Sequence, residues 1–227
     1  MNKKKQNKEI DNIFETKSAK VFYISGKRNS GKSYFTIQML INKHLLKNKF
    51  DEIYIINPTL NFDNKWKLLD IPEENIFGEF SLDLLERLDN YFQDKFSQNN
   101  KINFCLVLDD CLGSKDFKKN HTNIFDKMIY IGRHYNLNMI ILSQKFKGIS
   151  TGIRSNIDYF ITFDTYNDNE KKTIFEEMGI GTKKQFYEIW DFVFQKKYDK
   201  LIIDTANGKF YRNFNKLSIN LNKNNND

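Results

Sequence analysis

The stretch ISGKRNSGKSYF, residues 24–35, constrains the fold of this chain more than any other. Two glycines are followed at fixed spacing by a lysine and a serine, in the order Gly26-x-x-x-x-Gly31-Lys32-Ser33. The glycines let the backbone curl so that successive N–H groups point at phosphate oxygens, the lysine adds a point charge, and the serine hydroxyl can ligate Mg²⁺. The pattern predicts a nucleotide-binding loop made of Gly26, Lys27, Arg28, Asn29, Ser30, Gly31, Lys32, Ser33 and Tyr34.

Such a loop needs a strand before it and a helix after it, and the flanking sequence has both patterns. Apolar, β-branched and aromatic runs predict strands over residues 20–25, 52–58, 102–110, 137–144 and 157–163. Helical spacing of apolar residues predicts helices over residues 33–49, 81–96, 119–135 and 169–179. Strands that alternate with helices indicate an α/β fold with a mainly parallel central sheet and flanking helices.

The end of the chain has a different pattern. Residues 192–195, 200–204 and 209–213 are short apolar segments without helices between them. They predict a small antiparallel meander, with Asn207-Gly208 as a type I′ turn between the last two strands.

Two acids, Asp109 and Asp110, end the most continuous apolar run of the chain. A carboxylate at the end of a buried strand can reach Mg²⁺ through water, so we predict that Ser33 and Asp109 hold the metal. Asp110 is the candidate base that orients the attacking water. Many P-loop ATPases have Glu at this second position, and the shorter Asp predicts either a shifted backbone or slow turnover.

A further apolar strand, MIILSQ, follows the acidic one and ends in Gln144. If this strand lies between the acidic strand and the loop strand, Gln144 sits beside the γ-phosphate as a sensor. That arrangement is typical of additional-strand ATPases. Arg133 precedes this strand and Arg154 precedes the next, and either could reach the γ-phosphate of a neighbouring subunit as an arginine finger. Lys32, Asp110, Gln144, Arg133 and Arg154 are therefore the candidate catalytic residues.

The composition and net charge say less about the function than the motifs do. The net charge is +7, but four lysines within residues 1–8 leave only +3 for the rest, so a nucleic-acid partner does not follow from charge alone. We expect a flexible basic arm at 1–18, one ATPase domain at 19–215 and a polar low-complexity tail at 216–227. No apolar run of membrane-spanning length occurs, and two cysteines imply no disulfide framework, which fits a reducing intracellular setting.

Four segments, GKRNSGKS, LVLDDC, GRHYNLNMIILSQ and IRSNIDYF, together resemble the HerA/FtsK superfamily. Within it they are most similar to the genome-packaging ATPases of large double-stranded DNA viruses, including poxviruses, giant viruses and virophages. The Gln-terminated strand preceded by Gly-Arg is the most specific part. The similarity covers about residues 18–165.

The resemblance implies an additional-strand, RecA-like P-loop NTPase that uses ATP and Mg²⁺. It implies a homo-oligomeric ring, a pentamer or hexamer, that is stimulated by double-stranded DNA and moves it into a capsid. The expected location is the host cytoplasm or a viral factory, with association with capsid proteins or the virion and with no membrane partner. Carried across, Asp109 holds Mg²⁺, Asp110 activates water, Gln144 senses the γ-phosphate and Arg133 is the finger in trans.

Two other functions remain open at this point. A small-molecule kinase would need an arginine-rich lid and an acceptor pocket, for which only the stretch 59–80 offers room. An ATP-binding assembly switch with little turnover would follow if Asp110 is too short to act as a base. A GTPase is disfavoured because no Asn-Lys-x-Asp motif follows a strand.

Overall fold

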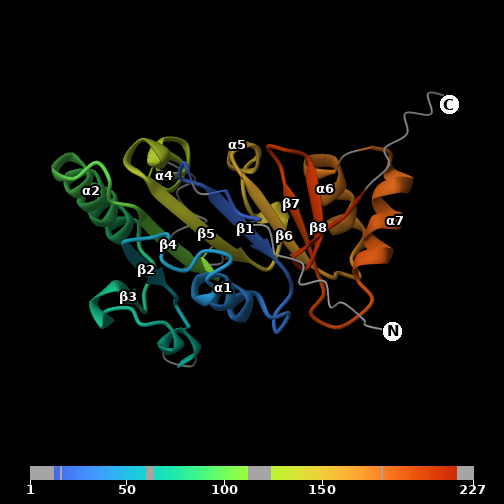
Figure 1. The fold of residues 1–227 in the computed structure, drawn as a ribbon, viewed down its shortest axis with the longest axis horizontal. Coiled ribbons are helices and arrows are strands. Elements are labelled where there is room, and N and C mark those ends of the chain that lie inside the picture. The colour runs from blue at the N-terminus through green and yellow to red at the C-terminus, as the bar shows by residue number, and fades with distance from the viewer. Residues whose placement is uncertain (1–12, 16, 60–63, 112–123, 180, 219–227) are drawn as a thin grey trace, which may run out of the picture.

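The computed structural model describes residues 13–15, 17–59, 64–111, 124–179 and 181–218 (Figure 1). Nine strands formed by these residues make one sheet in the order β3-β2-β4-β5-β1-β6-β7-β8-β9. The strands are β1 (Val21–Ser25), β2 (Glu52–Ile56), β3 (Ile76–Phe77), β4 (Phe104–Asp109), β5 (Leu137–Ser143), β6 (Tyr159–Phe163), β7 (Lys200–Asp204), β8 (Lys209–Arg212) and β9 (Asn215–Lys216). The pairs from β3 to β6 are parallel and those from β6 to β9 antiparallel. The predicted α/β fold with a mainly parallel sheet and a C-terminal meander is confirmed.

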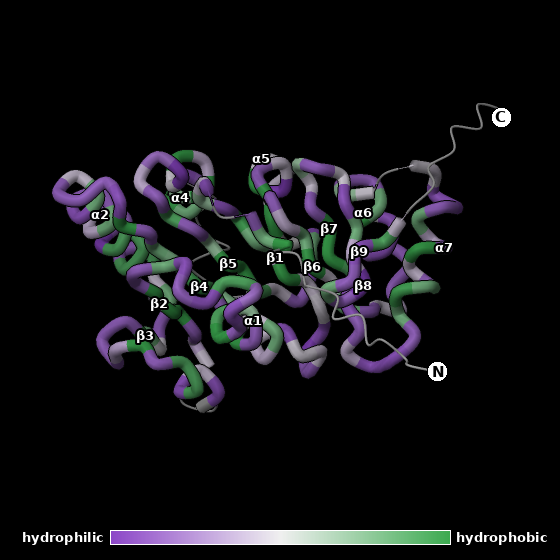
Figure 2. The backbone as a smooth tube through the Cα atoms, in the orientation of Figure 1, coloured by the Kyte–Doolittle hydropathy of each residue, from purple (hydrophilic) through white to green (hydrophobic). Residues whose placement is uncertain are grey.

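The order of the central strands decides where the functional groups meet. β5 lies between β4 and β1, as the additional-strand arrangement requires. Every residue of β1, β4 and β5 is buried, so these strands have no solvent face and their sequences are nearly continuous apolar runs. The same strands are coloured as hydrophobic in Figure 2, whereas the loops at their ends are hydrophilic.

Helices cover both faces of the sheet. One face packs against α2 (Leu82–Gln98), α4 (Ile124–Ile131), α5 (Thr151–Arg154), α6 (Asp168–Met178) and α7 (Lys183–Val193). The other face packs against α1 (Lys32–Ile41) and the 3₁₀ helix η2 (Asn64–Leu68). The remaining 3₁₀ turns are η3 (Glu73–Asn75), η5 (Gly132–Tyr135) and η6 (Phe146–Gly148). The two hydrophobic cores are therefore separated by the sheet (Figure 1).

Two of the predicted helices are shorter than the sequence pattern indicated. The helix expected over residues 33–49 ends at Ile41, and turns follow in which Leu45 and Leu46 are buried without helical geometry. The helix expected over 119–135 is α4 followed by the 3₁₀ turn η5, and its first five residues lie outside the described part.

The C-terminal region corrects two further predictions. Residues 192–195 are not a strand, because Phe192 and Val193 form the end of α7. The turn at Asn207-Gly208 is not type I′, because Asp204 pairs with Lys209 across a four-residue loop. In that loop only Gly208 has a positive φ, and the Asp204 carboxylate accepts hydrogen bonds from the backbone and side-chain nitrogens of Asn207 at 3.0 and 2.9 Å.

The packed body begins before the predicted domain boundary at residue 19. Phe14 is fully buried, and its ring lies 5.3 Å from the ring of Phe22 and 5.1 Å from that of Tyr159. Burying a phenylalanine contributes roughly 1.5–3 kcal/mol, so Ile13 and Phe14, which are both buried, belong to the packed body. Residues 1–12 of the predicted arm and 219–227 of the predicted tail lie outside the described residues. In the described part, no helix has both the length and the apolar character needed to cross a bilayer.

Candidate nucleotide-binding and hydrolysis site

Three parallel strands end side by side at the site. The register places Ser25 of β1 opposite Ser143 of β5, and Leu142 of β5 opposite Asp109 of β4. Backbone hydrogen bonds continue this alignment beyond the strands, with Gly26 N donating to Ser143 O at 3.1 Å and Asp110 N donating to Leu142 O at 3.2 Å. The loop, the acidic pair and Gln144 are therefore brought together at one edge of the sheet, as predicted.

The loop from Gly26 to Gly31 has the backbone geometry that the glycine spacing predicted. Gly31 adopts φ 96°, and α1 starts at the next residue. A Cβ on Gly26 would lie 2.5 Å from Ser30 Oγ and 3.2 Å from the Phe163 side chain, so only glycine fits there without a shift. Asn29 has φ 61°, which adds a second left-handed residue to the loop. Gly31 is the N-cap residue of α1, and the first turn of this helix contains no acidic residue. The N-terminus of α1 therefore presents its partial positive charge to the loop.

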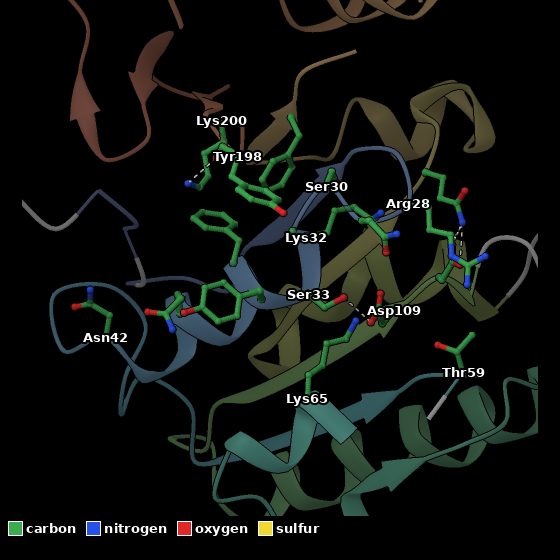
Figure 3. Close-up of a pocket in the computed structure, with 18 of the residues that line it drawn as sticks. Arg28, Ser30, Lys32, Ser33, Asn42, Thr59, Lys65, Asp109, Tyr198 and Lys200 are labelled. Atoms are coloured by element: carbon green, nitrogen blue, oxygen red, sulfur yellow. Dashed lines mark hydrogen bonds between the residues drawn. The ribbon is translucent and has the colours of Figure 1, made fainter. Parts of the chain in front are cut away.

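Lys32 points into this loop (Figure 3). Its Nζ donates to Gly26 O at 2.7 Å and to Lys27 O at 3.2 Å. The side chain is buried, and this burial lowers the pKa of the Lys32 ammonium, while Asp109 and Asp110 act in the opposite direction. An ammonium that burial disfavours has much to gain from an anion, so the loop is prepared for phosphate.

Asp109 and Ser33 form the oxygen pair that the sequence assigned to the metal. Ser33 Oγ donates to Asp109 Oδ2 at 2.8 Å, and Trp66 Nε1 donates to the same oxygen at 3.3 Å. Burial raises the pKa of Asp109, against the lowering effect of the Ser33 hydrogen bond and of the Lys65 and Lys32 charges. Mg²⁺ prefers hard oxygen ligands and is commonly held by one or two carboxylates with substrate phosphates, so the two side chains fit this ion. The described residues contain no cluster of three acids, histidines or cysteines that could hold a metal ion.

Asp110 and Gln144 are in direct contact. Gln144 Nε2 lies 3.1 Å from Asp110 Oδ1 and 3.0 Å from Oδ2, and both side chains line the same cavity as Lys32 and Ser33. Asp110 has φ 58°, a left-handed conformation that a non-glycine residue rarely adopts. This conformation sets the direction of the Asp110 carboxylate, and the choice between a shifted backbone and slow turnover stays a prediction.

The two predicted finger arginines lie at the amino ends of the parallel strands, away from the phosphate loop. Arg133 precedes β5 and Arg154 precedes β6, and both line a separate cavity with Val21 at the start of β1. Arg133 is exposed, whereas the Arg154 guanidinium pairs with the Glu177 carboxylate of α6. Neither arginine reaches the phosphate loop of its own chain, and their role in a neighbouring site stays a prediction.

Sequence reasoning missed an aromatic wall beside the loop. The wall consists of Phe35, Phe163, Tyr198, Phe214 and the stem of Lys200, all of which line the cavity of about 940 Å³ that contains the loop. Lys200 Nζ lies 5.0 Å from the ring centre of Phe35 and 5.9 Å from that of Phe214, and burial lowers the pKa of its ammonium. Tyr198 is 53% exposed and packs against Gly31. Phe35 and Phe163 are buried, so Tyr198 offers the most exposed ring of the wall, and an aromatic ring next to a phosphate loop suits a nucleoside base.

Sequence reasoning also missed the segment between β2 and α2. Trp66 is fully buried in the core, and its indole also contacts Asp109. Its neighbour Lys65 lines the cavity with Ser33 and Asp109. No sequence motif indicated either contact.

A phosphate loop after β1, an acidic pair after β4 and a Gln-terminated β5 between them define an additional-strand P-loop NTPase. A model of the Poxvirus A32 protein family matches residues 12–218 of this sequence. The chain therefore belongs to the Poxvirus A32 protein family, which confirms the resemblance drawn from the motifs.

Solved structures support the same fold. The chain is similar to the genome packaging NTPase B204 of Sulfolobus turreted icosahedral virus 2 in complex with ATP-γS, at 17% identity and TM-score 0.60, covering 86% of this chain and 96% of that one. For B204 in complex with AMPPCP the identity is 19%, the TM-score 0.63 and the coverage 86% and 96%. EssC (ATPases 2 and 3) of Geobacillus thermodenitrificans matches at 13% identity and TM-score 0.54, covering 86% of this chain and 38% of that one. A search of curated proteins gave no match.

Proposed function

We propose that this chain is the ATPase of a viral genome-packaging motor, which translocates double-stranded DNA into a capsid. The observation that carries this proposal is the insertion of β5 between β4 and β1, with Gln144 in contact with Asp110. A polar strand end in that position can couple the state of the γ-phosphate to the neighbouring strands, which an NTP-driven motor requires. Membership of the Poxvirus A32 family and the fold shared with the packaging NTPase B204 support it.

The site residues suit a stepwise account of ATP hydrolysis. The backbone N–H groups of the loop and Lys32 bind and orient the phosphates, and the aromatic wall holds the base. Ser33 and Asp109 would hold Mg²⁺, which would supply positive charge against the charge that develops on the phosphate oxygens. Asp110 accepts the proton of the attacking water, and Gln144 holds the Asp110 carboxylate in place by contacting both of its oxygens.

The ring and the trans finger belong to the same proposal. Arg28 lines the cavity from within the loop, and Arg212 of β8 is paired with Asp199. Arg133 is exposed at the amino ends of the parallel strands, where a neighbouring copy could approach it. A guanidinium delivered in this way stabilises the transferring phosphoryl group by about 10³–10⁵ in rate. We propose Arg133 over Arg154, because Arg154 already pairs with Glu177. Capsid proteins as partners and the host cytoplasm or viral factory as location follow from the packaging role.

The test is the ATPase rate of the full chain with and without duplex DNA at one fixed salt concentration, since DNA contact is salt-dependent. We expect Mg²⁺-dependent hydrolysis that duplex DNA stimulates, with Lys32→Ala as the inactive control. Hydrolysis without stimulation at any protein concentration would contradict the motor while leaving the ATPase. An inactive protein that still assembles on ATP would favour the switch instead.

Mixing two inactive variants tests the finger. Arg133→Ala keeps an intact phosphate loop and Lys32→Ala keeps an intact arginine, so a mixed ring contains some complete interfaces. We expect mixtures to regain activity that neither variant has alone. Activity that is only the weighted sum of the two would exclude Arg133 as a finger in trans.

A further inference from the structure

The segment between β2 and α2 places a second ammonium group in the hydrolysis site. Lys65 lies on η2 and is half-buried, and it lines the same cavity as Ser33, Asp109, Asp110 and Gln144. Figure 3 shows its side chain directed at Ser33 and Asp109 from the side opposite to Lys32. The two lysines therefore flank the space between the phosphate loop and the metal-side carboxylate.

The position of Lys65 is fixed by its neighbour. Trp66 is fully buried in the core on the α1 face, and its indole N–H donates to Asp109 Oδ2 at 3.3 Å. Leu69, one turn further on, is also buried. A side chain attached beside such an anchor is held close to its target, which reduces the entropy lost when it binds a substrate group.

The electrostatic setting agrees with this geometry. Burial lowers the pKa of the Lys32 ammonium, the Asp109 and Asp110 charges raise it, and the Lys65 charge lowers it further. Burial raises the pKa of the Asp109 carboxyl, and the Lys65 and Lys32 charges lower it. The two lysines therefore share the field of the same carboxylates, and the γ-phosphate of ATP would be a further anion within reach of both.

We propose that Lys65 is a catalytic residue that contacts non-bridging oxygens of the γ-phosphate in cis, across the site from Lys32. It stabilises negative charge on the transferring phosphoryl group from the β4 side while Lys32 does so from the β1 side. This inference rests on the proposed ATPase function and adds a second cationic group from the same chain to it. Lys65 lies in the segment between β2 and α2, which contains no nucleotide-binding motif.

The test compares Lys65→Met with Lys67→Met. Methionine keeps most of the apolar stem and removes the charge, and Lys67 is exposed on the same 3₁₀ helix without lining the cavity. We expect Lys65→Met to lower kcat about 10²-fold, the low end for the loss of one preorganised donor. Lys65→Arg should regain part of this loss because it keeps the charge. Lys67→Met should stay within twofold of the natural protein.

Nucleotide binding gives a readout that does not depend on turnover. We expect Lys65→Met to weaken ATP-γS binding about tenfold and to leave ADP binding within twofold, because only the triphosphate analogue carries the γ-phosphate. Equal changes for both nucleotides, or a lower Tm with an unchanged ratio of the two affinities, would mean that Lys65 only neutralises Asp109 and would overturn the proposal. If the natural protein binds both nucleotides but hydrolyses neither, the proposed ATPase fails while the affinity ratio still decides the role of Lys65.

Discussion

The two ends of the parallel strands differ in how their polar side chains are arranged. At the carboxyl ends of β1, β4 and β5, polar side chains hydrogen-bond one another around a cavity, as Ser33 does with Asp109 and Gln144 with Asp110. At the amino ends, Arg154 forms an ion pair with Glu177 of its own chain, and Arg133 is exposed. The carboxyl ends gather the candidate hydrolysis groups of this chain around one cavity, whereas the amino ends carry the two arginines around another. The contrast teaches that the arginines lie away from the phosphate loop of their own chain, and their role in a neighbouring site stays a prediction.

The largest expected effect comes from the metal-side carboxylate. Asp109→Asn should lower kcat by more than about 10²-fold, because a neutral amide cannot hold Mg²⁺ as a carboxylate does. Ser33 and Trp66 can still donate to its oxygen. The measurement is steady-state hydrolysis against Mg²⁺ concentration, with Asp126→Asn, on α4, as the control. Retained activity would remove Asp109 from the site.

The same variant should be more stable than the natural protein at neutral pH. The folded chain raises the pKa of Asp109 above its ordinary value of 3.8, so in the window above 3.8 the folded state binds more protons than the unfolded state. Stability therefore falls as pH rises through that window. Asparagine does not titrate, so the variant should lack this loss of stability. Thermal unfolding between pH 4 and 8 checks the sign, and an Asn variant that loses stability at neutral pH would contradict it.

A smaller effect is expected from the sensor. Gln144→Ala removes the contact to both oxygens of Asp110 without touching the phosphate loop, so kcat should fall about tenfold while ADP affinity stays unchanged. Lys145→Ala is the matched control, because it is the exposed neighbour outside the cavity. A change in ADP affinity instead of kcat would make Gln144 a binding residue.

The smallest effect on activity is expected at Arg154. Arg154→Ala removes the ion pair with Glu177 and the packing on the Phe146 ring, so it should cost about 1 kcal/mol of stability and leave DNA-stimulated hydrolysis within twofold. Arg133→Ala should do the reverse, with a large loss of stimulated activity and an unchanged Tm. If the two variants exchange these effects, Arg154 and not Arg133 is the finger.

The parallel strands and the phosphate loop were predictable because each is marked by a pattern of neighbouring residues in the sequence. The runs around β1, β4 and β5 are continuous and apolar, and the glycine spacing before Lys32 has one structural explanation. The place of Gln144 beside the phosphate loop was predicted only conditionally, since it depends on the order of strands and not on their sequences, and its contact with Asp110 was not predicted.

The C-terminal half was harder to predict, for two different reasons. In α7 the helical signal was present, because Phe186, Trp190 and Val193 repeat at helical spacing after a Thr182–Gln185 capping box, but the Phe-Val-Phe pattern at its end suggested a strand. The aromatic wall had no local signal at all. Phe35, Phe163, Tyr198 and Phe214 are far apart in the sequence and meet only because the antiparallel strands fold back beside α1.

The contact between Trp66 and Asp109 has an optical consequence. The chain has only two tryptophans, and the indole of Trp66 donates to Asp109, the carboxylate proposed to hold the metal. Indole emission depends on the charge and hydrogen bonding of the ring, so events at Asp109 change the fluorescence of unlabelled protein. With Trp190 replaced by phenylalanine, the remaining emission would report on the surroundings of the Asp109 carboxylate when nucleotide is added.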